Sequence, residues 1–251
     1  MGISVAVIAL NEEKNLRECL EAVSWADDIV VVDSGSSDGT VDIAEKCGAK
    51  VFKRDFDDFE KQKNFAMGKA EEEWVFFLDA DERVTSELGE EIREAAKTDQ
   101  YDGYYIPRNN IIFGKHLKYG GHQKDRHLRL FRKSVSCFKN PVHEKVVVDG
   151  AVGNLKNPMI HYSTESIGAY VEKLNHYSTL EARYLLEQGC KIGKYDIVIK
   201  PFMVFFRRYF IYFGFLDSFE GFVFYLLSGI NVFVKYAKYF ELIDEIEGAE
   251  K

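Results

Sequence analysis

The chain has 251 residues, of which 46% are hydrophobic and 29% are charged, and its net charge is -8. This is the composition of a globular protein that is long enough to bury a core, and it excludes disordered and collagen-like chains. The cysteines have no C-x-x-C spacing, which argues against a zinc or redox motif and suits a reducing cytoplasm. A net acidic chain is not expected to bind nucleic acid.

The first hundred residues alternate between strand and helix patterns. Strands are expected over 4–10, 28–32, 49–52 and 74–78, and helices over 16–23, 40–47, 62–70 and 86–97. The first apolar run is short and lacks a basic lead, so it is interpreted as a buried strand and not as a signal peptide. Asn11 is expected to cap the helix that follows it. The alternation predicts a mostly parallel α/β sheet flanked by helices.

The pattern changes after residue 101. Strands are expected over 103–113, 127–131 and 145–148 with no helices between them, and a long helix over 166–188. Residues 101–145 hold ten Lys or Arg against three acidic residues. A basic stretch in an acidic protein indicates a local anionic ligand such as a phosphate.

The C-terminal region is rich in aromatic residues, with sixteen Phe or Tyr in residues 201–240. Its longest uncharged run, residues 221–234, is shorter than the roughly 20 residues that a spanning helix needs. We therefore expect a helical extension over residues 191–251. Its aromatic and basic residues suit docking on an anionic membrane surface, and the alternative is packing on the main domain or in a homo-oligomer.

Polar clusters follow three of the predicted strands. Asn11 and Glu13 follow the first strand, and Asp33 follows the second. Asp79 and Asp81 follow the fourth. Ligands of open α/β sheets bind at the carboxyl ends of the strands, so the clusters are expected to converge at one edge. Two carboxylates one residue apart form a hard oxygen site that suits Mg²⁺ or Mn²⁺ together with substrate phosphates.

These clusters lie in stretches that match a known enzyme family in order and spacing. The stretches are SVAVIALNEE at 4–13, VVDSGSSDGT at 31–40 and FLDADE at 77–82. They resemble the signature of family 2 inverting glycosyltransferases, which have the GT-A fold. RLFRK at 129–133 and PVHEK at 141–145 further resemble the bacterial lipopolysaccharide-core β-glucosyltransferases. The resemblance implies a GT-A domain over residues 1–190, followed by the helical extension over residues 191–251.

The resemblance also implies which residues bind the donor. Glu13 and Asp33 would contact the ribose or base of a nucleotide-sugar, and Lys63 and Asn64 would lie near it. Arg129 belongs to a basic group, with Arg126, Arg132 and Lys133, that either grips phosphates or forms a solvated strand face. The donor-binding positions expected in this way are Ala9, Asn11, Glu13, Asp33, Ser34, Lys63, Asn64, Asp79, Ala80 and Arg129.

Metal and catalytic positions follow from the same resemblance. Asp79 and Asp81 would hold the divalent cation, with Asp81 the more direct ligand, and His161 could reach the metal or the diphosphate. Glu144 occupies the position of the family's catalytic base. Asp125 is an alternative base, because a carboxylate in reach of the acceptor hydroxyl can take its proton.

These assignments predict metal-dependent, inverting transfer of a hexose from a nucleotide-sugar, with UDP-glucose as the expected donor. The expected acceptor is a lipopolysaccharide-core or other lipid-linked saccharide, which would place the enzyme in the cytoplasm, peripheral to the inner face of the cell membrane. One alternative is a non-catalytic nucleotide-sugar-binding or membrane scaffold protein. Another is a sugar nucleotidyltransferase, which would need a Gly-rich phosphate loop where this chain has Asn11-Glu12-Glu13.

Overall fold

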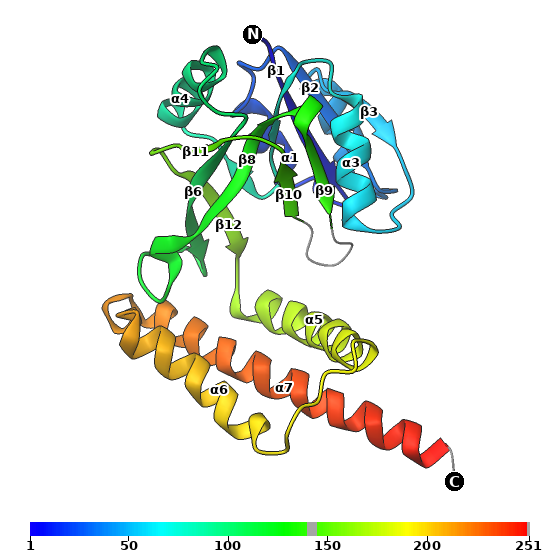
Figure 1. The fold of residues 1–251 in the computed structure, drawn as a ribbon, viewed down its shortest axis with the longest axis vertical. Coiled ribbons are helices and arrows are strands. Elements are labelled where there is room, and N and C mark those ends of the chain that lie inside the picture. Colours follow the sequence, from blue (N-terminus) through cyan, green and yellow to red (C-terminus); the bar gives the residue numbers. More distant parts are fainter. Residues whose placement is uncertain (140–144, 250–251) are drawn as a thin grey trace. The chain divides into compact units, whose positions relative to one another are not determined.

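The computed structural model describes residues 1–139 and 145–249. The chain forms two compact units, of which unit 1 contains residues 1–109 and 125–161 and unit 2 contains residues 110–124 and 162–251 (Figure 1). Strands β6 (Gly103–Ile112) and β12 (Met159–Thr164) each continue from one unit into the other. The division differs from the expected boundary at residue 190, because the long helix before that residue packs with the C-terminal helices.

The N-terminal part of unit 1 is a parallel sheet with helices on both faces. Its strands lie in the order β3-β2-β1-β4, with parallel pairing throughout. This confirms the α/β fold expected from the alternating pattern. The elements are β1 (Ile3–Ala9), α1 (Leu16–Glu21), β2 (Asp28–Asp33), α2 (Thr40–Lys46), β3 (Lys50–Lys53), α3 (Phe59–Lys69), β4 (Trp74–Phe77) and α4 (Ser86–Lys97).

Strand β1 is buried on both of its faces. Val5 and Val7 belong to the core cluster that includes Leu88 of α4, whereas Ala6 belongs to the cluster that includes Ala66 of α3. Alternate residues of a strand point to opposite faces, so a strand covered on both sides is apolar on both. This explains the apolar run over residues 5–9, and the buried hydroxyl of Ser4 before it donates to Asp28 at 2.8 Å.

Antiparallel strands extend the sheet beyond β4. Strand β8 (Arg126–Arg132) pairs antiparallel with β4 and with β6, and β11 (Val152–Asn154) runs parallel to β6. The two-residue strand β5 (Glu82–Arg83) pairs with β12. Strands β9 (Ser136–Lys139) and β10 (Lys145–Val148) form a separate two-stranded sheet. A short 3-10 turn, Lys133–Val135, joins β8 to β9.

Unit 2 is built mainly from helices. Its longest helix, α7, packs against both α5 and α6 (Figure 1). None of the helices in the described part of the chain is long and apolar enough to cross a membrane. The elements of the unit that follow β6 are β7 (Lys115–Leu117), a 3-10 turn (His122–Lys124), α5 (Ile167–Glu187), α6 (Asp196–Phe206), a π-helical turn (Arg207–Ile211), a 3-10 turn (Gly214–Leu216) and α7 (Phe219–Ala249).

A buried tyrosine ties α7 to the loop that follows β7. Tyr225 is fully buried, and its hydroxyl donates to the Asp217 carboxylate and lies 3.1 Å from the carbonyl oxygen of Tyr119. Asp217 also accepts the backbone N–H groups of Lys118 (2.9 Å) and Tyr119 (3.1 Å). Burial and the hydrogen bond to Asp217 raise the pKa of the Tyr225 hydroxyl. Gly120 has φ +66° and packs against the Tyr225 ring, so a side chain would be strained and crowded there.

We predict that Tyr225→Phe destabilises the protein by about 1–3 kcal/mol, because it removes a hydroxyl on a fully buried ring that donates to a charged carboxylate. The measurement is the urea unfolding transition. Tyr195→Phe is the matched control, since Tyr195 is 83% exposed and its loss is expected to change stability by less than about 0.5 kcal/mol. Equal midpoints for the two variants would contradict this view of the Tyr225 contact.

Candidate active site

The three polar clusters lie at one edge of the parallel sheet, as the sequence predicts. In the parallel register, Ala9 at the end of β1 lies beside Asp33 at the end of β2, and Ala6 pairs with Phe77 at the end of β4. The residues that follow β4 therefore emerge at the same edge as the residues that follow β1 and β2. Ala9 and Ala80 are buried, and the carbonyl oxygen of Ala9 accepts the backbone N–H of Ser34 at 2.9 Å, so their contact with a donor stays a prediction.

Asn11 connects the loops that follow β1 and β2. It has φ +55°, its backbone N–H donates to Ser36 Oγ (2.8 Å), and its side-chain oxygen accepts from the backbone N–H of Ser37 (2.9 Å). Helix α1 begins only at Leu16. The expectation that Asn11 caps this helix is therefore wrong, because its side chain is used to bridge two loops.

The expected donor-contacting carboxylates also hold this edge together. Asp33 is 1% exposed and accepts backbone N–H groups of the loop that follows it at 3.1 and 3.2 Å. Glu13 accepts the backbone N–H of Gly39 at 2.9 Å. Ser34 Oγ accepts from the Gln62 amide at 3.0 Å. These contacts place the expected donor residues in one bonded loop cluster, and their roles toward a nucleotide stay predictions.

A buried ion cluster lies at the end of β4. Arg129, on β8, donates to the carboxylates of Asp79 and Glu82, the latter at 2.8 Å. Lys63 Nζ lies 3.7 Å from Asp79 Oδ1. Burial by itself would raise the pKa of Asp79, but the positive charges of Arg129 and Lys63 outweigh burial and hold it well below its usual range. Asp79 is therefore an anion already paired with two cations.

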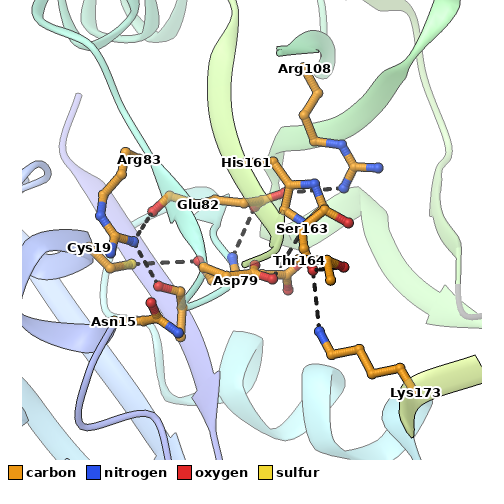
Figure 2. A network of polar contacts seen from close by, with 12 residues as sticks. Asn15, Cys19, Asp79, Glu82, Arg83, Arg108, His161, Ser163, Thr164 and Lys173 are labelled. Atoms are coloured by element: carbon orange, nitrogen blue, oxygen red, sulfur yellow. Dashed lines mark hydrogen bonds and ion pairs between the residues drawn. The ribbon is translucent and has the colours of Figure 1, made fainter. Parts of the chain in front are cut away.

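Glu82 is a member of this cluster that the sequence interpretation did not assign. It is fully buried and accepts the backbone N–H of Asp79 at 3.0 Å (Figure 2). Arg108 Nη1 lies 3.5 Å from its carboxylate. Burial raises the pKa of Glu82 despite the nearby guanidinium of Arg129. Its position directly after the D-x-D sequence could have indicated a role in the site. Its partners Arg129 and Arg108, however, lie on β8 and β6, far away in the chain.

The alternative base, Asp125, has both carboxylate oxygens engaged. Arg108 Nε lies 3.0 Å from one oxygen, and His127 Nε2 lies 2.9 Å from the other. Arg108 therefore bridges Asp125 to Glu82. Neither Arg108 nor His127 was assigned to the site from the sequence.

A cavity of about 600 Å³ opens beside this cluster in unit 1. Five Lys or Arg side chains, one histidine and one carboxylate line it, which gives the cavity a charge that suits an anion. Guanidinium groups in particular match the geometry of phosphate oxygens. The lining residues are Lys63, Asp79, Tyr105, Arg108, Arg126, His127, Leu128, Arg129, Phe138, Lys145 and Val146.

Two members of the expected basic group are used elsewhere. Arg132 pairs with Asp99 at 2.6 Å and stacks on the Trp74 ring at 4.8 Å. Lys133 donates to the carbonyl oxygen of Ala70 at 2.8 Å. Arg132 is the last residue of β8 and Lys133 lies in the 3-10 turn that follows, and neither of them lines the cavity, whereas Arg126 and Arg129 do.

Asn64 and Lys63 have different surroundings although they are neighbours on α3. Both polar atoms of the Asn64 amide bond the backbone of Phe138, each at 2.9 Å, and so hold β9 against α3. Lys63 instead faces the cavity, with Nζ over the rings of Phe77 (5.1 Å) and Phe138 (5.7 Å). Donor binding by Asn64 stays a prediction, and its observed contact is to the wall of the cavity.

The expected metal residues are brought together only in part. His161 Nε2 lies 3.4 Å from Asp81 Oδ2, whereas the Asp79 carboxylate is paired with Arg129. Over residues 1–139 and 145–249, no group of three or more His, Cys, Asp or Glu side chains is clustered closely enough to hold a metal ion. The expected base, Glu144, lies outside the described residues.

The parallel α/β sheet with antiparallel strands beyond it has the GT-A fold, which solved glycosyltransferases share. Residues 4–149 match the family model described as "Glycosyl transferase family 2". The chain belongs to this family and is a glycosyltransferase.

Relatives with similar sequences carry names of the same activity. The chain is 29% identical to "Lipopolysaccharide core biosynthesis glycosyltransferase LpsC" of Rhizobium meliloti, over 94% of this chain and 94% of the relative. It is 31% identical to "Uncharacterized glycosyltransferase RT0209" of Rickettsia typhi, over 96% of this chain and 87% of the relative.

Solved structures share the fold at lower identity. S. aureus TarS 1-349 in complex with UDP-GlcNAc has a TM-score of 0.51 and 18% identity, over 92% of this chain and 81% of that one. Glucosyl-3-phosphoglycerate synthase from Mycobacterium tuberculosis, in complex with Mn²⁺, UDP and phosphoglyceric acid, has a TM-score of 0.50 and 16% identity, over 76% and 80% of the two chains.

We predict that Arg129→Gln lowers the free energy of unfolding by about 3–5 kcal/mol, because it takes the shared cation away from Asp79 and from the fully buried carboxylate of Glu82. Urea unfolding measures the change, and Arg126→Gln, at an exposed position of the same strand, is the control. Adding Glu82→Gln to Arg129→Gln is expected to restore part of the loss. If the Arg129 and Arg126 variants are equally stable, the ion cluster does not stabilise the fold.

Proposed function

We propose that this glycosyltransferase transfers a hexose, with inversion, from UDP-glucose to a lipopolysaccharide-core or other lipid-linked saccharide. The acceptor would place the enzyme at the cytoplasmic face of the inner membrane. The observation that carries the proposal is the basic cavity at the D-x-D edge, where five cations face one carboxylate. A nucleoside diphosphate is an anion that such a wall can neutralise.

The names of similar proteins support the donor and acceptor classes. TarS was solved with UDP-GlcNAc, and the glucosyl-3-phosphoglycerate synthase with UDP. LpsC, which this chain matches over nearly its whole length, is named for lipopolysaccharide core biosynthesis. The choice of glucose over other hexoses rests on the sequence resemblance to lipopolysaccharide-core glucosyltransferases.

A divalent cation, Mg²⁺ or Mn²⁺, fits the donor set at this edge. Asp81 offers a carboxylate and His161 an imidazole next to it, and both can bind such an ion once substrate phosphate and water complete its shell. Asp79 lies in the same turn, where its carboxylate is shared with Arg129 and Lys63. When bound, the ion would add positive charge beside the diphosphate.

The proposed reaction is a single displacement. The acceptor hydroxyl oxygen forms a bond to the anomeric carbon, the bond from that carbon to the phosphate oxygen breaks, and UDP leaves. Arg129 and Lys63 would neutralise the charge that develops on the leaving diphosphate. Glu144 would take the proton from the acceptor hydroxyl. The carboxylate of Asp125 is less suited to this role, because both of its oxygens already accept contacts from Arg108 and His127.

We predict that UDP with Mn²⁺ raises the melting temperature, because binding to the native state alone stabilises it. At about 100 times Kd the gain is about 2.7 kcal/mol, or roughly 5–10 °C for a chain of this size. Asp81→Ala should abolish the metal-dependent shift, and Asp149→Asn, at an exposed position, should retain it. A shift with GDP, ADP or TDP but not with UDP would reject the proposed donor, and no shift with any nucleotide would reject the donor site.

Glu144→Gln is expected to retain the UDP-dependent shift but to lower the transfer rate by about 100-fold or more, since the amide cannot accept the proton. The measurement is transfer of labelled glucose from UDP-glucose to a lipopolysaccharide-core preparation. Asp149→Asn serves as the control for loss of a nearby carboxylate. Unchanged transfer by Glu144→Gln together with a lost rate in Asp125→Asn would assign the base to Asp125 instead.

A further inference from the structure

Helix α6 packs against α7 with one face only. Gly229 of α7 lies directly under α6, where an added Cβ would be 2.9 Å from the carbonyl oxygen of Pro201. Phe205 packs on the same side, with its ring 6.1 Å from that of Phe222 of α7. None of the residues of α6 is fully buried, so its other face has no cover from the part of unit 2 that the structure describes.

The uncovered face of α6 is apolar. Its most exposed members are Val198 (68%), Phe202 (64%) and Met203 (60%). The positions are spaced by one, four, five and eight residues, which places them on one side of a helix. We call the exposed side chains at these positions the α6 face, and they are Val198, Ile199, Phe202, Met203 and Phe206.

A shallow apolar groove of about 370 Å³ is formed where the α6 face meets Val232 of α7. Three basic side chains, Lys200, Arg207 and Lys235, line the same groove. Long basic side chains can lay their apolar stems along such a surface while their charged ends remain in water. The groove is therefore apolar at its centre and basic around it.

The charge of this region is opposite to that of the chain. Residues 191–216 contain five Lys or Arg and one acidic residue, in a protein with net charge -8. In a two-fold dimer the same patch meets itself, so a dimer through this face would bring two basic regions together. An anionic bilayer complements the charge and also accepts the aromatic side chains at the depth of its headgroups.

We propose that the α6 face docks on an anionic lipid bilayer surface. The apolar side chains would enter the headgroup layer, and Lys200 and Arg207 would meet lipid phosphates. This inference deepens the proposed function, and rests on it, because a lipid-linked acceptor must be reached at such a surface.

The test is co-sedimentation of the full chain with phosphatidylcholine vesicles that do or do not contain phosphatidylglycerol. We expect binding to the anionic vesicles only, and release at high salt, where charges are screened beyond about 3 Å at 1 M. Phe202→Ser with Phe206→Ser should weaken binding by about ten-fold or more. Tyr177→Ser with Leu180→Ser is the matched control, since these α5 side chains are 51% and 45% exposed.

A second variant pair tests charge without touching apolar side chains. Lys200→Gln with Arg207→Gln should weaken binding to anionic vesicles, while Arg183→Gln, at an exposed position of α5, should not. The UDP-dependent melting shift is measured for every variant, and we expect it to be unchanged. It reports folding and donor binding independently of lipid.

The outcomes separate the two proposals. Absence of binding to anionic vesicles, or an equal loss in the α5 control, overturns the docking inference and leaves the donor site unaffected. A dimer that Phe202→Ser with Phe206→Ser dissociates, without vesicle binding, also overturns it and assigns the α6 face to a second copy. Vesicle binding through the α6 face without any nucleotide-dependent shift supports docking and rejects the proposed donor.

Discussion

The buried guanidinium of Arg129 lies between two carboxylates and joins β8 to the turn that follows β4 in unit 1. Arg129 is 7% exposed and shares its charge between Asp79 and Glu82. Burying charges carries a desolvation penalty that only close, complete pairing offsets. The pairing is possible because β8 lies antiparallel beside β4, which places Arg129 next to the turn where β4 ends. The position of the D-x-D edge therefore depends on a contact between two strands of opposite direction.

The same ion cluster orients cations that line the cavity. The Arg108 guanidinium is held by ion pairs with Glu82 and Asp125, which orient it without a ligand. Lys63 is held between Asp79 and two aromatic rings. Cations that are already oriented need little reorganisation when a diphosphate enters, and this is the condition under which electrostatic stabilisation of a leaving group is effective.

Unit 2 differs from unit 1 in that its helices carry much aromatic surface that is only partly buried. It places a large amount of aromatic surface on helices, buries part of it around α7, and leaves the α6 face uncovered. The contact of Tyr225 with Asp217 fixes the start of α7 to the loop after β7. The interior of the unit is thereby ordered by buried polar contacts, while the uncovered apolar surface remains available for a partner.

Much of the fold was determined by local sequence. The strands and helices of the first hundred residues follow from apolar periodicity, which needs no knowledge of distant partners, and the D-x-D site is contiguous in the chain. The sequence could not determine that Arg129 pairs with Asp79 and Glu82, which precede it by 50 and 47 positions. Nor could it determine that Arg108 bridges Glu82 and Asp125. Those contacts exist only once antiparallel strands extend the parallel sheet. The tertiary structure decided them because charged side chains from separate strands become neighbours only when the backbone register between those strands is set.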